Sequence, residues 1–272
     1  MPRKFPHLEG KEVKRKFIRE KAFDCRNCFY KEVEWFEYSE EEQEAVRQSR
    51  KTRARASPPK IKNLNDSYSR KNFRWILFNN FGANDYHVTL TFDDEHLKKG
   101  IDDCKREFSN YIRRLKRLYG KHGLPLRYLY VTEGKNDGSR LHYHLIVNGG
   151  VPRDDIERLW KGGTRTNCDR LQLDDDGTLT ALSNYLMKSQ DTKKKCERSW
   201  SCSQNIKRPD ITVDDNKVSR RSMHKVQDAS RNDEVRAVMS RIYPKFKVID
   251  YEIGQNPVTG RDYARFRMVR IE

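Results

Sequence analysis

The middle of the chain has the most regular pattern of hydrophobic and polar positions, and it opens with a strand followed by a helix. Residues 86–92 alternate strictly, with Val88, Leu90 and Phe92 on one face and His87, Thr89 and Thr91 on the other. Residues 100–119 then carry apolar side chains at helical spacing, against a face rich in arginine and lysine. The pattern predicts a half-buried strand and an amphipathic helix that ends near Gly120.

Five further segments continue this succession of strand and helix patterns. They are predicted strands at 126–132, 141–147 and 167–173, and predicted helices at 152–160 and 179–189. The order strand, helix, strand, strand, helix, strand is the split βαβ pattern of ferredoxin-like domains. We therefore predict an α+β fold with a central antiparallel sheet that has helices on one face and an open face for a site.

The N-terminal part of the chain is predicted to be a basic extension. Ser39 and the glutamates after it have the character of a capped helix start. Residues 45–65 contain seven lysines and arginines, no acid and two prolines, which predicts a charged arm or linker that can lie along phosphates. A helix capped at 65–67 and ending at Phe81 is predicted to follow.

The C-terminal part is polar and basic. It contains a predicted helix at 232–242 and two predicted strands at 246–253 and 262–271. These strands could extend the central sheet or form an accessory hairpin. The predicted organisation is an N-terminal extension and arm at 1–64, a central domain at 65–210, and a C-terminal helix and β-hairpin extension at 211–272.

Composition narrows the class of protein. The 272 residues carry a formal net charge of +17, with 36% charged and 35% hydrophobic residues. Such an excess of positive charge indicates a polyanionic partner, and nucleic acid is the leading candidate. No apolar stretch approaches the length of a membrane span, and the first residues lack the apolar core of a secretion signal. We expect a cytoplasmic protein without membrane association, and free thiols at Cys104 and Cys168.

Two histidines separated by one residue give the first indication of chemistry. On the strand predicted at 141–147, His142 and His144 point to the same face, where the pair can bind one metal ion. The alternative is a pair of hydrogen-bonded surface histidines. Glu133 ends the preceding strand and lies directly across from His142 if the turn is centred in the loop between them. One carboxylate and two imidazoles suit manganese, magnesium with water, or a zinc-like ion.

A tyrosine and a lysine on the helix predicted at 179–189 give the second indication. Tyr185 and Lys188 are three positions apart and share a face, so the phenol and the ammonium can reach one site. A phenol is a poor nucleophile at neutral pH until a nearby cation favours its ionised form. The alternative is that Tyr185 packs with its apolar neighbours against the sheet.

Three short motifs, taken together in their order, carry a resemblance to a known family. They are His87–Phe92 (HVTLTF), His142–His144 (HYH) and Asn184–Lys188 (NYLMK). The region from about 65 to 210 resembles the HUH endonuclease superfamily, specifically the replication initiator (Rep) proteins of rolling-circle plasmids and single-stranded DNA phages. The third motif has one tyrosine, with Ser189 four residues after it, so the resemblance implies a single-tyrosine enzyme.

The resemblance implies a metal-dependent DNA endonuclease and strand transferase with an HUH fold. Single-stranded origin DNA would lie across the open sheet face, and Mn²⁺ or Mg²⁺ bound by His142, His144 and Glu133 would polarise the scissile phosphate. Tyr185 would attack, leaving a 5′-phosphotyrosine and a free 3′-hydroxyl for rolling-circle replication, and reversal would rejoin the strand. Lys188 would orient the tyrosine or a metal-bound water and offset negative charge.

The resemblance also implies partners in a bacterial host cell. No glycine-rich phosphate-binding motif ending in Lys-Ser or Lys-Thr follows the nuclease region. A host helicase is therefore expected to unwind the duplex, and a host DNA polymerase is expected to extend the free 3′-hydroxyl.

Other interpretations stay open. A single-tyrosine HUH transposase has the same chemistry, although such chains are usually much shorter. A non-enzymatic, nucleic-acid-binding ferredoxin-like domain would stack bases on aromatics such as Tyr130 and Tyr143, although by parity these lie on the face opposite His142.

A zinc site is a further alternative. Its four thiolates would come from Cys25, Cys28, Cys196 and Cys202. The second pair has the wrong spacing for a zinc knuckle, so ordinary thiols are the preferred interpretation.

Overall fold

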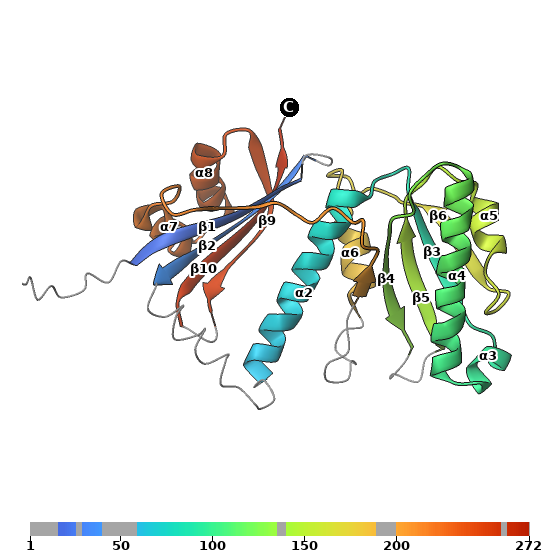
Figure 1. Ribbon diagram of the computed structural model, residues 1–272. Coiled ribbons are helices and arrows are strands. Elements are labelled where there is room, and N and C mark those ends of the chain that lie inside the picture. The colour runs from blue at the N-terminus through green and yellow to red at the C-terminus, as the bar shows by residue number, and fades with distance from the viewer. Residues whose placement is uncertain are drawn as a thin grey trace, which may run out of the picture. The chain divides into compact units, whose positions relative to one another are not determined.

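The structure is a computed structural model in which residues 16–25, 29–39, 59–134, 140–188, 200–256 and 260–271 are described. The described chain is α+β, with seven helices and two five-stranded sheets (Figure 1). It forms two compact units. The central unit contains residues 25–30 and 63–209, and the terminal unit contains residues 1–24, 31–62 and 210–272.

The elements of the central unit follow the predicted order. They are α2 (Pro59–Asn80), β3 (Tyr86–Thr91), α3 (Asp94–Lys98), α4 (Ile101–Lys121), β4 (Tyr128–Glu133), β5 (His142–Val147), α5 (Arg153–Arg158), β6 (Thr166–Arg170), α6 (Thr180–Leu186) and β7 (Trp200–Cys202). The strand order is β6-β3-β5-β4-β7, and every neighbouring pair is antiparallel. This topology is compatible with a ferredoxin-like split βαβ domain, so the predicted fold class is confirmed.

One face of the central sheet is buried by α4 and α5. Phe108, Tyr111 and Leu115 recur at helical spacing along α4 and are buried in one cluster with Val88 and Leu90 of β3. Because successive side chains of a strand point to opposite faces, the polar residues of β3 must face away from this core. The hydrophobic pattern therefore determines which face of the sheet carries the polar side chains.

The opposite face is less open than predicted. Leu129, Val131 and Ile146 point to this side and are buried. The ring of Trp200 in β7 lies 6.0 Å from the ring of Phe73 in α2, and α2 and α6 lie on the side of the sheet away from α4 (Figure 1). Apolar side chains of β4 and β5 on this face need cover from water, and these elements supply part of it.

Helix α2 begins earlier than predicted. Pro59 is its first residue, whereas the cap was expected at 65–67. Proline suits the first position of a helix because its φ angle is already helical and its missing N–H has no partner to lose there. Pro59 therefore begins a helix within the segment that was expected to be a charged arm. Residues 45–58 of that predicted arm lie outside the described residues.

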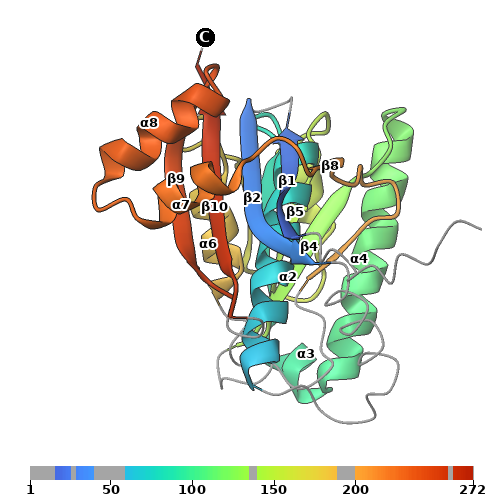
Figure 2. The same cartoon turned by 90° about the vertical axis from the view of Figure 1, so that its left-hand side faces the viewer.

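The terminal unit is built on the second sheet, with strand order β8-β1-β2-β10-β9 (Figure 2). Its elements are β1 (Lys16–Cys25), β2 (Tyr30–Ser39), β8 (Ile211–Asp214), α7 (Arg220–Gln227), α8 (Asn232–Ile242), β9 (Phe246–Gln255) and β10 (Asp262–Arg270). Helix α8 and the last two strands were predicted. These strands pair with each other, and β10 lies next to β2, so they belong to the second sheet and do not extend the central one. Ser39 is the last residue of β2, and the glutamates after it, where a helix start was predicted, lie outside the described residues.

Helices α7 and α8 contribute the other half of the core of the terminal unit. Val33 and Trp35 of β2 and Phe266 of β10 are fully buried in this core. The indole N–H of Trp35 donates to the buried carboxylate of Glu20 over 2.9 Å, and the hydroxyl of Tyr243 donates to the same carboxylate. The buried acid is thus satisfied by donors from both ends of the chain.

Two expectations drawn from composition concern membranes and thiols. Among the described residues, no helix has both the length and the apolar character needed to cross a membrane. Cys104 and Cys168 are free, buried thiols, as predicted, and Cys25 and Cys202 are free as well. The other two cysteines of the alternative zinc site lie outside the described residues.

Candidate active site

The hairpin of β4 and β5 brings a carboxylate and a histidine into register. Glu133 is the last residue of β4 and pairs directly with His142, the first residue of β5. Directly opposed residues of an antiparallel pair share a face, and His144 shares it too because it lies two positions further along β5. The predicted pairing of Glu133 with His142 is confirmed.

The three side chains converge. The Nε2 atom of His142 lies 3.2 Å from Oε2 of Glu133, and the Nε2 atom of His144 lies 3.6 Å from the same oxygen. One ligand atom from each residue lies within 4.8 Å of the other two. Two imidazole nitrogens and one carboxylate oxygen can hold a divalent ion, and three protein ligands leave coordination positions for water or substrate.

Burial makes this convergence more informative. His144 is 3% exposed, and within the described part of the chain its Nε2 atom has no hydrogen-bond partner. Glu133 is 8% exposed. A buried ring nitrogen that faces a carboxylate without a hydrogen bond is unfavourable unless a proton or a metal ion lies between them. The three residues, which we call the His-Glu cluster, therefore fit a cation.

The pKa values in the His-Glu cluster are shifted by the contacts between its carboxylate and its imidazoles. Burial opposes the ionised form of Glu133, but the hydrogen bond with His142 and the proximity of His144 outweigh it and hold the pKa of this carboxyl well below its usual range. The hydrogen bond with Glu133 in turn raises the pKa of His142. A metal ion would have to displace the proton that Nε2 of His142 shares with Glu133, because imidazole coordinates metals in its neutral form.

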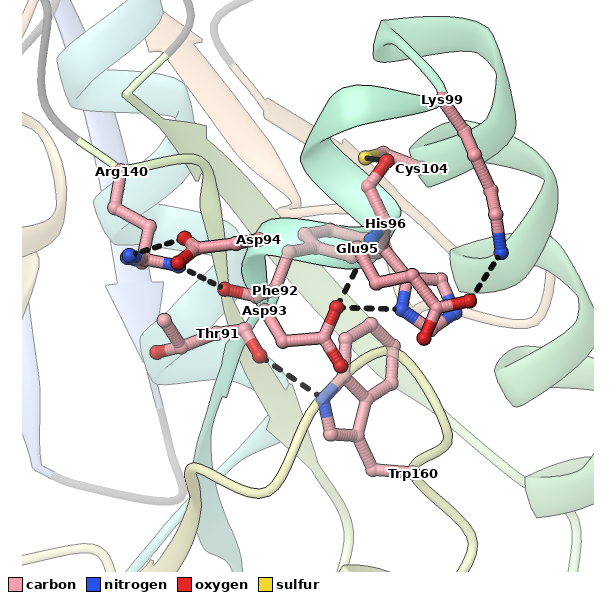
Figure 3. Close-up of polar contacts among 10 residues, drawn as sticks. All are labelled: Thr91, Phe92, Asp93, Asp94, Glu95, His96, Lys99, Cys104, Arg140 and Trp160. Atoms are coloured by element: carbon pink, nitrogen blue, oxygen red, sulfur yellow. Dashed lines mark hydrogen bonds and ion pairs between the residues drawn. The ribbon is translucent and has the colours of Figure 1, made fainter.

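A backbone carbonyl fixes the other ring nitrogen of His142. The Nδ1–H group of His142 donates to the carbonyl oxygen of Arg140 over 2.8 Å, which leaves Nε2 facing Glu133. Figure 3 shows how Arg140 is held: its guanidinium donates to the carbonyl of Phe92 over 3.0 Å and pairs with Asp94 at 2.6 Å. These contacts position the chain just before β5 begins.

His87 of β3 also lies at this site, although no part in binding the metal was predicted for it. Its Nε2 atom lies 3.1 Å from Nδ1 of His144, and the hydroxyl of Thr89 lies 3.4 Å from the same nitrogen. Burial and the nearby His144 lower the pKa of His87 to about 4, so its ring is neutral at neutral pH. The alternation of β3 signals a polar face, but the pairing of β3 with β5 is needed to place His87 beside the cluster.

Helix α6 places the predicted tyrosine beside the His-Glu cluster. The ring of Tyr185 lies 5.5 Å from the ring of His144, centroid to centroid, at an interplanar angle of 77°. Tyr185 is 45% exposed, whereas its neighbour Leu186 is buried, so the phenol lies outside the core. The Nζ atom of Lys188 lies 4.0 Å from the centre of the Tyr185 ring, in a cation–π contact. The structure thus brings all five predicted site residues together.

The aromatic residues that a binding module would use for stacking pack against helix α4 instead. Tyr143 is 3% exposed and stacks on Phe108 of α4, with ring centroids 3.8 Å apart. Tyr130 is half-buried and packs against the same Phe108 ring at 4.7 Å. Because α4 covers both tyrosines, they do not offer the platform that base stacking requires.

All five site residues fall within a match to a known family. Residues 85–190 match the family model described as replication-associated protein ORF2/G2P. The match supports a protein of the replication initiator (Rep) class, with a role in DNA replication. No curated protein and no solved structure matches the chain significantly.

Proposed function

We propose that the protein is a replication initiator that nicks and rejoins single-stranded origin DNA by HUH-type chemistry with one tyrosine. Tyr185 is the proposed nucleophile, and the His-Glu cluster of Glu133, His142 and His144 is the proposed site for Mn²⁺ or Mg²⁺. The observation that carries the proposal is an exposed phenol 5.5 Å from the ring of His144, inside the region that matches a replication-associated family.

The proposed reaction transfers a phosphodiester from DNA to the tyrosine. The phenolic oxygen of Tyr185 attacks the scissile phosphorus, an oxygen–phosphorus bond forms, and the bond from phosphorus to the 3′-oxygen breaks. The phenol gives up its proton, and the departing 3′-oxygen takes up a proton. The products are a 5′-phosphotyrosine and a free 3′-hydroxyl, which a host polymerase can extend. Attack by a 3′-hydroxyl on the phosphotyrosine rejoins the strand.

Each side chain has a part in this proposal that suits its surroundings. The ammonium of Lys188 contacts the Tyr185 ring and can offset the negative charge that the attacking oxygen carries. A divalent ion in the His-Glu cluster supplies Lewis-acid polarisation of the phosphate when it is bound. The net charge of +17 attracts the DNA backbone to the protein.

The test is the formation of a covalent adduct. The full chain is incubated with Mn²⁺ and a pool of random single-stranded oligonucleotides labelled at either the 5′ or the 3′ end, and is then analysed under denaturing conditions. A 5′-phosphotyrosine joins the protein to the downstream fragment, so the adduct should carry the 3′-end label and lack the 5′-end label. Tyr185→Phe should abolish the adduct, because the substitution removes only the attacking oxygen.

Tyr128→Phe is the matched control, because Tyr128 lies on β4 with its side chain on the face opposite Glu133. This variant should form the adduct as the unmodified protein does. His142→Ala should bind DNA but form little adduct. An adduct that survives in Tyr185→Phe would disprove the assignment of the nucleophile. DNA binding without any adduct, across the whole pool, would instead favour a binding module.

A further inference from the structure

In both histidines of the His-Glu cluster, the second ring nitrogen, Nδ1, has a polar neighbour within hydrogen-bond distance. Nδ1 of His142 is directed at a backbone carbonyl, that of Arg140. Nδ1 of His144 has no such carbonyl within hydrogen-bond distance in the described chain, and faces Nε2 of His87 at 3.1 Å. In metal sites, the second nitrogen of a histidine ligand usually donates to an acceptor that fixes the orientation and tautomer of the ring. The two ligands therefore have different kinds of support.

The position of the proton on His144 follows from its surroundings. A neutral imidazole has one N–H group and one lone pair. The Nε2 atom of His144 faces Glu133 and is buried without a hydrogen-bond partner among the described residues, so its lone pair is the one available to a cation. When a cation takes this lone pair, the proton of the neutral ring must be on Nδ1, and Nδ1 needs an acceptor.

Two acceptors lie within reach of Nδ1, and distance favours one of them. Nε2 of His87 lies at 3.1 Å, within the usual range for a hydrogen bond, whereas the hydroxyl of Thr89 lies at 3.4 Å, beyond the usual N–H···O range of about 2.7–3.2 Å. The rings of His87 and His144 are close to parallel, with an interplanar angle of 30° and centroids 5.2 Å apart. Both rings can thus direct the relevant nitrogens at each other.

We propose that His87 is a positioning residue of the metal centre: its Nε2 accepts the Nδ1–H of His144 and thereby keeps the Nε2 lone pair of His144 directed at the cation site. The inference rests on the proposed function, because it assigns His87 a role through a ligand of that centre. His87 pairs with Ile146, whereas His144 pairs with Thr89. His87 is thus two positions further than Thr89 from the end of the sheet that carries Glu133, and is not placed to be a ligand itself. It acts through His144 alone.

The first measurement is the tautomer of His144 in the full chain with Mg²⁺ bound, because the ion then occupies the place between Nε2 and Glu133 that a proton can take in its absence. Long-range nitrogen–proton NMR spectra of protein with labelled histidines distinguish an Nδ1–H ring from an Nε2–H ring. We expect the Nδ1–H form in the unmodified protein. An Nε2–H ring would overturn the proposal, and this result does not depend on how any variant folds.

The second measurement is the affinity for Mn²⁺ alone, by calorimetry, in three variants whose folding is checked by circular dichroism. His87→Phe removes the acceptor and should weaken binding about 10- to 100-fold, the range found for such outer contacts. His87→Gln places an amide oxygen near the position of Nε2 and should recover most of the affinity. Thr89→Val removes the competing acceptor and should bind Mn²⁺ more tightly than His87→Phe.

The outcomes separate this inference from the function on which it rests. If the unmodified protein binds no Mn²⁺, the proposed metal centre fails, and the role of His87 fails with it. If Mn²⁺ binds and His87→Phe binds it equally well, only the role of His87 is disproved. A loss in Thr89→Val without a loss in His87→Phe would identify Thr89 as the acceptor and would likewise overturn the proposal.

Discussion

At the residue scale, Asp93 lies between the end of β3 and the start of α3, close to the strand that carries His87. Its carboxylate accepts a hydrogen bond from the backbone N–H of His96 over 2.9 Å and lies 2.8 Å from the ring nitrogen of the same residue (Figure 3). Both interactions favour the ionised carboxylate, and the backbone hydrogen bond is the main reason why the pKa of Asp93 is lowered. Asp93 is thus the N-cap of α3.

The stability lost on replacing Asp93 should depend on pH in a defined direction. A carboxyl whose pKa is lower in the folded state stabilises the protein above its unfolded pKa of about 3.9, and this contribution is lost as the pH falls through the folded value. Asp93→Ala should lower the free energy of unfolding at pH 7 by about 1 kcal/mol, the usual effect of removing a cap. Urea denaturation measures the change.

The matched variant is Asp93→Asn, which keeps an oxygen for the cap but cannot ionise. It should be closer to the unmodified protein at pH 3 than at pH 7, because the charge-dependent part of the stability is already lost in acid. A difference that grows as the pH falls would contradict this account of Asp93.

Those parts of the candidate site in which spacing along one element places two side chains on the same face could be predicted from the sequence. His142 and His144 are two apart on a strand, and Tyr185 and Lys188 are three apart on a helix, so local geometry groups each pair. His87 could not be grouped with them in this way. Its neighbours at the site come from β5, 57 residues further along the chain, and only strand pairing brings them together.

At the scale of elements, the β4–β5 hairpin depends on Gly134. This residue follows Glu133 directly and has a φ angle of +83°, a conformation that glycine adopts without strain. A Cβ atom at this position would lie 2.3 Å from the carbonyl oxygen of Arg140, which accepts the hydrogen bond from His142. Glycine thus permits the close approach that lets the hairpin orient a ring of the His-Glu cluster.

Gly134→Ala should therefore weaken metal binding as well as stability. The positive φ angle costs about 1–2 kcal/mol for a residue with a side chain, and the contact with Arg140 must be relieved by moving its carbonyl. We expect Mn²⁺ affinity to fall about 10-fold or more, because the contact that orients His142 is disturbed. Calorimetry measures the affinity, and thermal unfolding measures the stability.

Gly123→Ala is the control for backbone strain. Gly123 has a φ angle of +69°, and a Cβ atom there would meet nothing within 4 Å. The variant should lose the stability that the positive φ angle costs, yet bind Mn²⁺ normally. Equal losses of Mn²⁺ affinity in the two variants would mean that strain, and not the contact with Arg140, explains the effect.

Elements with a clear period were predictable, and elements held by distant polar partners were not. Helix α4 and strand β3 each bury one regular apolar face, so their sequences display the period directly. Strand β2 carries Glu34 and Glu37, which pair with Arg265 and Arg261 of the C-terminal segment. Without those partners in view, β2 has the mixed charge of a solvated extension.

At the scale of the whole molecule, the net charge of +17 should govern the affinity for single-stranded DNA. Each neutralised phosphate contributes about −0.7 to the slope of log affinity against log salt concentration for single strands. We expect a steep negative slope of log affinity against log salt concentration for a pool of random single-stranded oligonucleotides. The binding is measured in EDTA, where no metal-dependent cleavage can occur. A flat dependence on salt would contradict an electrostatic binding surface.

Lys188→Gln extends this measurement to the site. If Lys188 contacts the DNA backbone beside Tyr185, the slope should become shallower by about 0.7, the value for one phosphate. The affinity should fall for all sequences alike, because a phosphate contact carries no information about the base. An unchanged slope would restrict Lys188 to its contact with the Tyr185 ring.

Local sequence patterns were enough to predict the split βαβ order, the two faces of its strands and helices, and the residue pairs of the candidate site. These follow from local periods of two and 3.6 residues, which act whatever the rest of the chain does. Tertiary structure decided the position of His87 beside His144, the cover over part of the site face, and the pairing of both ends of the chain in one sheet. Those outcomes depend on contacts between distant segments, and no local pattern of hydrophobic and polar residues specifies which segments will meet.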